Sequence, residues 1–121
     1  MTIKRRLIAP LGAALEEIKS KENLKISTKY RILKIQDIVK KELEYYGILI
    51  EELRERYGGT YNEETKSIQF PDDRVEELGL ELTCFENEEI EMPEVYINLE
   101  ELEPIQLSWD TLEVLMPFIK E

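Results

Sequence analysis

The longest hydrophobic pattern in the chain runs from Thr28 to Tyr57 and predicts one long helix. Its apolar positions recur every three or four residues, at Ile32, Ile35, Val39, Leu43, Tyr46, Ile50, Leu53 and Tyr57. This spacing is typical of one helical face. A second apolar stripe runs beside it, formed by Tyr30, Leu33, Ile38, Tyr45 and Leu49. We expect Ser27 or Thr28 to cap the helix, Gly58-Gly59 to end it, and other elements to cover both stripes.

Shorter patterns on either side of the long helix predict the remaining elements. Residues 10–21 form a short helix with Leu11, Leu15 and Ile18 on one face. Residues 60–70 alternate around a polar turn, as in a β-hairpin. Residues 71–82 form an acidic helix with a capping box of Asp73 and Glu76 and an inner face of Val75, Leu78 and Leu82. Strand-like alternation follows at Ile90, Met92, Val95, Ile97 and Leu99, interrupted by Pro93.

The segment "LSWDTLEVLMPFI" at residues 107–119 predicts a last helix, which Ser108 caps and Pro117 ends. We expect this helix to close the core by covering the second stripe of the long helix. The alternative is an exposed apolar anchor for a partner, formed by Trp109, Met116 and Phe118. Trp109 is the member expected to be most exposed, because it lies between the capping Ser108 and Asp110.

These elements together predict a single α+β domain over residues 1–121 that is mostly helical. One long helix is packed by short N- and C-terminal helices, with a small β-hairpin or antiparallel element. Residues 1–8 are candidates for a flexible basic N-terminus, residues 10–57 form a helical hairpin, and residues 60–121 form an acidic α+β part.

Composition narrows the function classes. The 121 residues include no histidine and one cysteine, Cys84, which we expect to be a small buried hydrophobe. Without histidine there is no Ser-His or Cys-His nucleophile pair, and no glycine-rich phosphate loop or calcium-loop spacing is present. We therefore predict a protein that is not an enzyme and has no cofactor and no metal site. No run approaches the ~20 apolar residues of a membrane span, so a membrane is not expected as a partner.

Charge is divided unequally along the chain. Residues 1–57 hold 13 Lys or Arg and 9 Asp or Glu, whereas residues 58–121 hold 3 and 18, and the net charge is −11. The candidate partner-binding surface is the acidic face formed by Asp72, Asp73, Glu76, Glu77, Glu81, Glu88, Glu89 and Glu91. Helix neighbours three or four residues apart lie ~5–6 Å from each other, close to the separation of phosphates along a nucleic-acid strand. The face therefore suits a DNA mimic that binds a basic protein, or it simply keeps the protein soluble.

The basic residues gather in the first part of the chain, at Lys4, Arg5, Arg6, Lys19, Lys21, Lys25, Lys29, Arg31 and Lys34. Nucleic-acid binding there is disfavoured, because the acidic half opposes it and no base-stacking motif accompanies it. Attraction between the basic end of one copy and the acidic end of another is an alternative, and it would give a homo-oligomer.

Two phrases of the sequence resemble small phage and prophage proteins of unknown function. Thr28, Lys29, Tyr30, Leu33, Lys34, Tyr57 and Gly58 match a long helix that begins near "T-K-Y-K-L-x-K" and ends in "KYG". Leu107, Ser108, Leu112, Leu115, Pro117, Phe118 and Ile119 match a closing "LS-x-x-x-L-x-x-L-x-P-F-I". The resemblance covers about residues 24 to 120. It implies a phage gene, expression in the cytoplasm of a bacterial host, a non-enzymatic role, and a closing phrase that belongs to the fold.

The function expected from the sequence is that of a phage-encoded, non-catalytic protein-interaction factor. Its acidic surface would inhibit or modulate a host-defence or nucleic-acid-handling protein. The alternative is a phage structural or assembly accessory that self-associates through the long helix.

Overall fold

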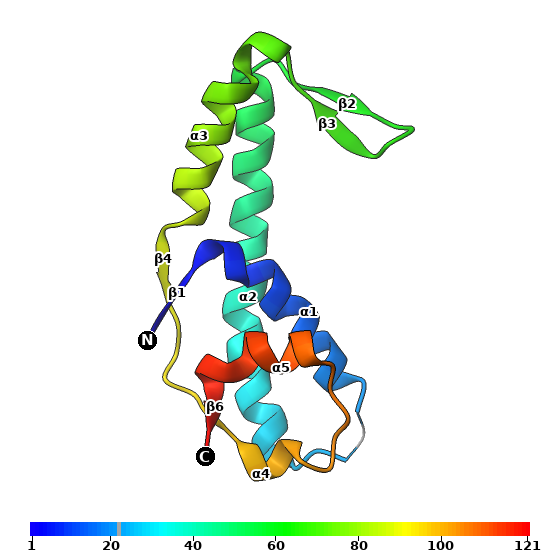
Figure 1. Cartoon of the computed structure of the whole chain (residues 1–121), viewed down its shortest axis with the longest axis vertical. Helices are drawn as coiled ribbons and strands as arrows, with labels where there is room; N and C mark the ends of the chain where they lie inside the picture. Colours follow the sequence, from blue (N-terminus) through cyan, green and yellow to red (C-terminus); the bar gives the residue numbers. More distant parts are fainter. Residues whose placement is uncertain (22) are drawn as a thin grey trace.

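The molecule is organised along one long helix, α2 (Ile26–Arg56), against which the other elements lie (Figure 1). The computed structural model describes residues 1–21 and 23–121. At 1.5 Å per residue, α2 is about 46 Å long. The fold is mostly helical α+β, as the sequence predicts.

The other elements follow the chain in this order: β1 (Thr2–Lys4), η1 (Arg5–Leu7), α1 (Ile8–Lys19), β2 (Thr60–Asn62), β3 (Ser67–Gln69), η2 (Asp72–Arg74), α3 (Val75–Glu86), β4 (Glu89–Glu91), β5 (Ile97–Asn98), α4 (Leu99–Leu102), α5 (Trp109–Leu115), η3 (Met116–Phe118) and β6 (Ile119–Lys120). None of the helices in residues 1–21 and 23–121 has both the length and the apolar composition needed to cross a membrane.

The main core lies where α1 crosses the first half of α2 and α5 packs on α1. The predicted faces of both helices meet here, and Leu15, Ile18 and Ile35 are completely buried. The remaining core side chains come from all parts of the chain: Ile3, Ile8, Leu11, Ala14, Ile32, Val39, Ile90, Met92, Ile97, Leu102, Leu115 and Phe118. Full burial of a Leu or Ile side chain is worth about 1.5–3 kcal/mol, so this layer accounts for most of the stability of the fold.

Three two-stranded sheets complete the fold. β2 pairs with β3 in the predicted antiparallel hairpin, with Tyr61 opposite Ile68. β1 pairs antiparallel with β4, and Ile3 lies opposite Ile90. β5 and β6 pair in parallel. The expectation of a flexible segment at residues 1–8 is therefore wrong, because β1 completes a sheet and the side chains of Ile3 and Ile8 enter the core.

The second half of α2 leaves the main core and forms a separate projection, which we call the distal arm (residues 43–86). It consists of α2 from Leu43 onward, the β2–β3 hairpin, η2 and the antiparallel α3 (Figure 1). Gly58, at φ 70°, ends α2 in the left-handed conformation that glycine favours. Among the apolar side chains of the arm only Tyr57 and Leu78 are buried. The arm is thus a thin two-helix layer rather than a second core.

The C-terminal segment closes the core, as the sequence predicts, but it packs on a different helix from the one expected. Ser108 caps α5 by accepting a hydrogen bond from the Thr111 backbone N–H, and Leu115 and Phe118 are buried. The segment therefore closes the core. It does so by packing on α1 rather than over the second stripe of α2, and Tyr30 and Leu33 of that stripe remain exposed.

Helix starts were predicted less well than helix interiors. Lys25 is the N-cap of α2 without a side-chain hydrogen bond, and Ser27 and Thr28 lie inside the first turn. The expected capping box of Asp73 and Glu76 is absent, because residues 72–74 form the 3-10 turn η2 and place Arg74 at the cap position of α3.

Two side chains of α3 differ from their expected burial. Val75, predicted on the inner face, is half exposed. Cys84, predicted as a buried hydrophobe, is exposed. Only the side of α3 that faces α2 is covered, and both residues lie off that side. Leu78 is buried and Leu82 faces α2, as the sequence predicts.

Candidate functional site

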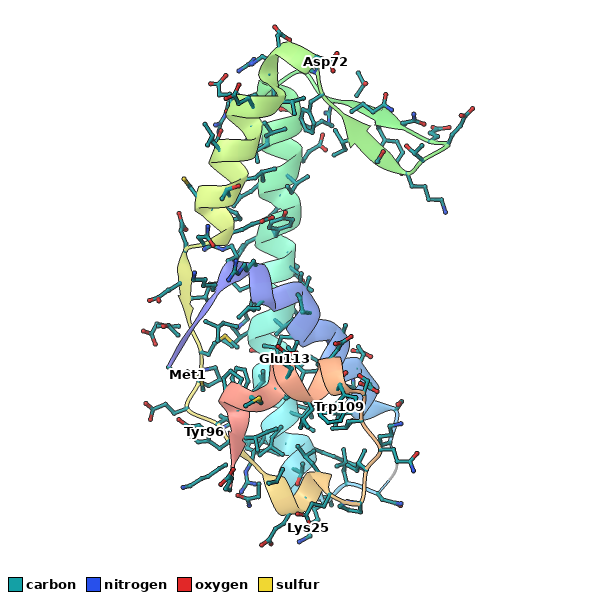
Figure 2. All side chains as sticks on the ribbon, in the orientation of Figure 1. Met1, Lys25, Asp72, Tyr96, Trp109 and Glu113 are labelled. Atoms are coloured by element: carbon teal, nitrogen blue, oxygen red, sulfur yellow. The ribbon has the colours of Figure 1, made fainter. Side chains whose placement is uncertain are left out.

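The predicted acidic face begins at the tip of the distal arm. Asp72 lies at the end of the molecule opposite Lys25 (Figure 2). Asp73 follows it in η2, and Glu76 and Glu77 lie in the first turn of α3. All four carboxylates are exposed. In the described part of the chain only Glu77 has an ion-pair partner, Arg74 at 3.7 Å. These four residues form what we call the acidic tip.

Glu81 lies on the same helix in a different setting. Its carboxylate accepts a 2.7 Å hydrogen bond from Arg56 and a second one from the hydroxyl of Tyr57. The Tyr57 bond, supported by Arg56, lowers the pKa of Glu81, and the same bond raises the pKa of Tyr57. Glu81 therefore joins α3 to α2, and its charge is balanced within the molecule.

The other three predicted acidic residues lie at the opposite end of α3 and on β4. Glu88 accepts a 2.6 Å hydrogen bond from Arg5, and Glu91 lies 3.9 Å from the N-terminal amine. Glu89 is exposed and lies opposite Lys4 in the β1–β4 pair. The structure thus divides the predicted acidic face into the acidic tip and a second group that cations of the N-terminal segment partly neutralise.

The distal arm as a whole is strongly negative. Residues 43–86 contain twelve Asp or Glu and four Lys or Arg. Three of these cations are already engaged, since Arg54 pairs with Glu51 at 2.5 Å, Arg56 with Glu81, and Arg74 with Glu77. The excess of carboxylates gives the arm a negative field that attracts cationic surfaces over the screening length of ~8–10 Å.

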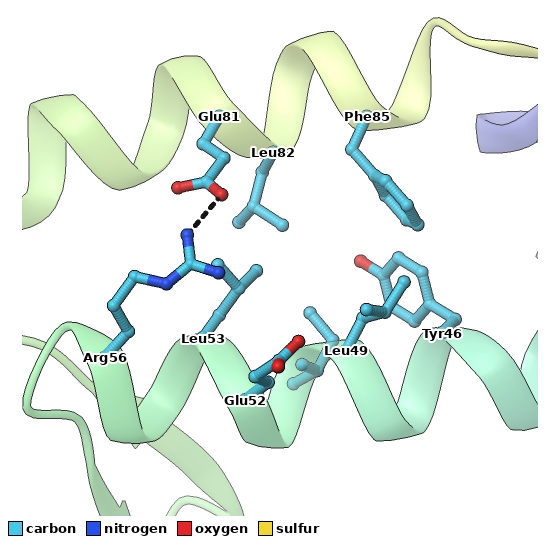
Figure 3. A pocket seen from close by; sticks show the side chains of 9 residues that line it. Tyr46, Leu49, Glu52, Leu53, Arg56, Glu81, Leu82 and Phe85 are labelled. Atoms are coloured by element: carbon cyan, nitrogen blue, oxygen red, sulfur yellow. Dashed lines mark hydrogen bonds and ion pairs between the residues drawn. The ribbon is translucent and has the colours of Figure 1, made fainter.

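A groove runs between α2 and α3 along one side of the arm (Figure 3). Its volume is about 100 Å³, which is below the ~300–1,000 Å³ of small-molecule sites. The apolar walls come from both helices: Tyr46, Leu49, Ile50, Leu53, Leu82 and Phe85. Sequence analysis assigned these positions to helix faces but missed the groove, because the spacing of two helices that are distant in sequence is not encoded in either pattern alone.

The predicted apolar anchor lies elsewhere, on α5, and only part of it is available. The side chain of Trp109 is 88% exposed and that of Met116 is 64% exposed. Phe118 is 1% exposed, so its assignment as an anchor is wrong. Figure 2 places Trp109 in the lower part of the molecule, far from Asp72. The anchor and the acidic tip are therefore separate surfaces.

Groups that could support chemistry are sparse at these surfaces. Among residues 1–21 and 23–121, no three carboxylate or thiol side chains gather in an arrangement that could hold a metal ion.

Comparison with protein-family models, curated proteins and solved structures finds no match to this chain. The resemblance to small phage proteins therefore stays a prediction from the two sequence phrases.

Proposed function

We propose that this protein is a non-catalytic interaction factor whose distal arm binds a basic protein. The observation that carries the proposal is the acidic tip, where Asp72, Asp73, Glu76 and Glu77 are exposed at the end of a projecting arm. A like-signed cluster at the end of a projection can approach a cationic cleft without obstruction from the rest of the molecule. Its field also speeds association at low ionic strength.

The geometry of the tip suits a partner that normally binds nucleic acid. Asp72 and Asp73 in η2 and Glu76 and Glu77 in the first turn of α3 place four exposed carboxylates on two consecutive turns of the chain. A nuclease, polymerase or defence protein with a phosphate-binding cleft could accept them in place of phosphates. Together with the resemblance to phage proteins, this supports a phage-encoded modulator of a host protein in the bacterial cytoplasm.

Two variants of equal charge test this proposal. In the tip variant, Asp72, Asp73, Glu76 and Glu77 become the corresponding amides. In the control, the exposed residues Glu94, Glu103, Glu113 and Glu121 become Gln, which removes the same charge away from the arm. Each protein is immobilised and exposed to bacterial lysate, and bound proteins are eluted with salt and then competed with duplex DNA.

The expected result is a basic nucleic-acid-binding protein that wild type and control retain, that salt or DNA releases, and that the tip variant fails to hold. If the tip variant retains the same proteins as wild type, the acidic tip is only a solubilising surface and the proposal is wrong.

A second candidate function is self-association through α2, for an assembly role. The first half of the predicted seam is not available for this, because Ile32, Ile35 and Val39 are buried in the main core. The outward face of α2 is available, and it exposes Ile26, Tyr30 and Leu33 over its first two turns. Sedimentation equilibrium of wild type and of the double variant Tyr30→Ser, Leu33→Ser tests it. A wild-type oligomer that the variant loses would favour assembly over the acidic tip.

A further inference from the structure

The distal arm presents apolar surface that the protein itself does not cover. A helix with an apolar face normally buries it against a neighbouring layer. In the arm, α3 covers α2 from one direction only, and the side chains between the two helices are half-buried: Tyr46, Leu49, Ile50, Leu53, Leu82 and Phe85. Figure 3 shows Leu53 and Tyr46 of α2 facing Leu82 and Phe85 of α3 across the groove.

Polar pairs mark the two ends of this groove. At one end Arg56 donates to Glu81, and at the other the hydroxyl of Tyr46 donates to Glu86 at 3.3 Å. The eleven residues of α2 from Tyr46 to Arg56 span about 15 Å. An apolar strip of this length matches two to three turns of an approaching helix.

The charge around the groove decides which kind of helix fits. Glu52 lines the groove and is exposed, and the arm around it carries twelve Asp or Glu against four Lys or Arg. The acidic tip lies on η2 and the first turn of α3, beyond the Arg56–Glu81 pair. A second copy of the arm would bring the same excess of carboxylates against this surface, and like charges placed together repel. An apolar strip with an acidic rim is instead complementary to an amphipathic helix with a basic polar face.

We infer that the α2–α3 groove of the distal arm binds a basic amphipathic helix of a partner protein. The inference rests on the proposed function and adds the form of the partner's contact. The cavity of about 100 Å³ receives apolar side chains from the helix rather than a whole small molecule. Lysines or arginines flanking those side chains meet Glu52 and the acidic tip.

Synthetic peptides test the inference on the full-length protein. The probe is a fluorescent amphipathic helix of roughly 18 residues, with leucines at i, i+3, i+4 and i+7 and lysines elsewhere. The control peptide has the same composition in an order that destroys the apolar face. Fluorescence anisotropy measures both affinities at physiological salt. The expected result is binding of the amphipathic peptide about tenfold or more tighter than binding of the scrambled one.

A matched pair of protein variants locates the site. Leu49→Glu places a charge on the groove floor, whereas Ile48→Glu places the same charge on the neighbouring exposed side chain, outside the groove. Both variants make the arm more acidic, so electrostatics alone would strengthen binding of a cationic peptide to each. We expect Leu49→Glu to weaken binding of the amphipathic peptide about tenfold and Ile48→Glu to leave it near the wild-type value. Leu49→Gln serves as the second variant if circular dichroism shows that Leu49→Glu loses helix.

The outcomes separate this inference from the proposed function. Equal binding of both peptides, abolished by the tip variant, would overturn the groove and leave the acidic tip as the interface. Binding of neither peptide would overturn the groove, and a tip variant that still retained the lysate partner would separately overturn the proposed function. Equal weakening by Ile48→Glu and Leu49→Glu would also overturn the groove, because a contact specific to its floor would not respond to Ile48.

Discussion

The guanidinium carbon of Arg5 lies 4.0 Å from the centre of the Phe85 ring. The same side chain donates to the Phe85 carbonyl at 3.0 Å and to Glu88 at 2.6 Å, and its Nε lies 3.8 Å from Glu42. One residue of the N-terminal segment therefore holds the end of α3 and contacts α2, at the junction between the main core and the distal arm.

Removal of the Arg5 side chain should loosen the arm from the core. We expect Arg5→Ala to lower the free energy of unfolding by about 1–3 kcal/mol, because a partly buried cation–π contact and hydrogen bonds to charged groups are lost together. Arg6→Ala is the control, since Arg6 is exposed next to it in sequence. Urea denaturation measures both variants. Hydrogen exchange should speed up at residues 83–88 in Arg5→Ala alone, and unchanged exchange there would contradict the role given to Arg5.

Glu17 makes the docking of α5 on α1 sensitive to acid. Its carboxylate accepts hydrogen bonds from the hydroxyls of Thr111 and Ser108 and from the Ser108 backbone N–H. The Thr111 bond, followed by the Ser108 bonds, lowers the pKa of Glu17. A carboxyl with a lowered folded-state pKa stabilises the fold above its unfolded pKa of ~4.3, and this stabilisation is lost as pH falls through the folded pKa.

The variant Glu17→Gln should therefore melt at a lower temperature than wild type at pH 7, and this difference should shrink as pH falls below about 4. Thermal melts between neutral and acidic pH measure the effect. Glu113→Gln, on the exposed side of α5, is the control and should follow the wild-type curve. A constant difference between Glu17→Gln and wild type across the whole range would show that the carboxylate charge is not involved.

Truncation of a leucine should destabilise the protein much more in the main core than on the exposed side of α3. Leu15 is completely buried between helices, whereas Leu80 on α3 is 65% exposed. We expect Leu15→Ala to cost about 2–5 kcal/mol of unfolding free energy through lost burial and a residual cavity. Leu80→Ala should stay within about 0.5 kcal/mol of wild type. Chemical denaturation of both variants provides the comparison. Similar losses at the two positions would mean that α3 buries its outer face.

Two glycines of the distal arm should respond in opposite directions to a methyl group. A Cβ on Gly59 would lie 2.7 Å from a ring carbon of Phe70 and 2.9 Å from a methyl carbon of Ile68, whereas a Cβ on Gly47 would meet nothing within 4 Å. We expect Gly59→Ala to destabilise the protein by about 1–3 kcal/mol through overpacking. Gly47→Ala should stabilise α2 by about 0.5–1 kcal/mol through its higher helix propensity. Melting temperatures of the two variants should move to opposite sides of wild type.

Local features of the fold could be predicted from the sequence, because they depend on residues close together in the chain. The spacing of Ile32, Ile35 and Val39 predicted both α2 and the face that it buries. Gly58-Gly59 predicted its end, and Ser108 and Pro117 predicted the limits of α5. Each of these signals acts within a few residues, through helix periodicity, capping or a backbone restriction. The exposure of Trp109 was also predicted from its immediate neighbours.

What the sequence left open depends on which distant segments meet. The pairing of β1 with β4 joins residues nearly ninety positions apart. The N-terminal segment, expected to be flexible, therefore forms a strand and places Arg5 against the end of α3. The same limitation applies to the candidate site. Eight acidic residues looked equivalent in the sequence, yet Arg56 engages Glu81, and Arg5 engages Glu88.

The sequence by itself determined α1, α2, α3 and α5, the hairpin and the excess of negative charge, because periodicity, turn residues and composition are properties of the chain. It did not predict α4, because Leu99, with which α4 begins, continues the strand-like alternation before it. The tertiary structure decided that α5 packs on α1, that α3 covers α2 from only one direction, and that four carboxylates remain exposed at the tip of an arm with an open apolar groove. These outcomes depend on which apolar faces bury one another and which cations reach which anions, and such contacts exist only once the chain has folded.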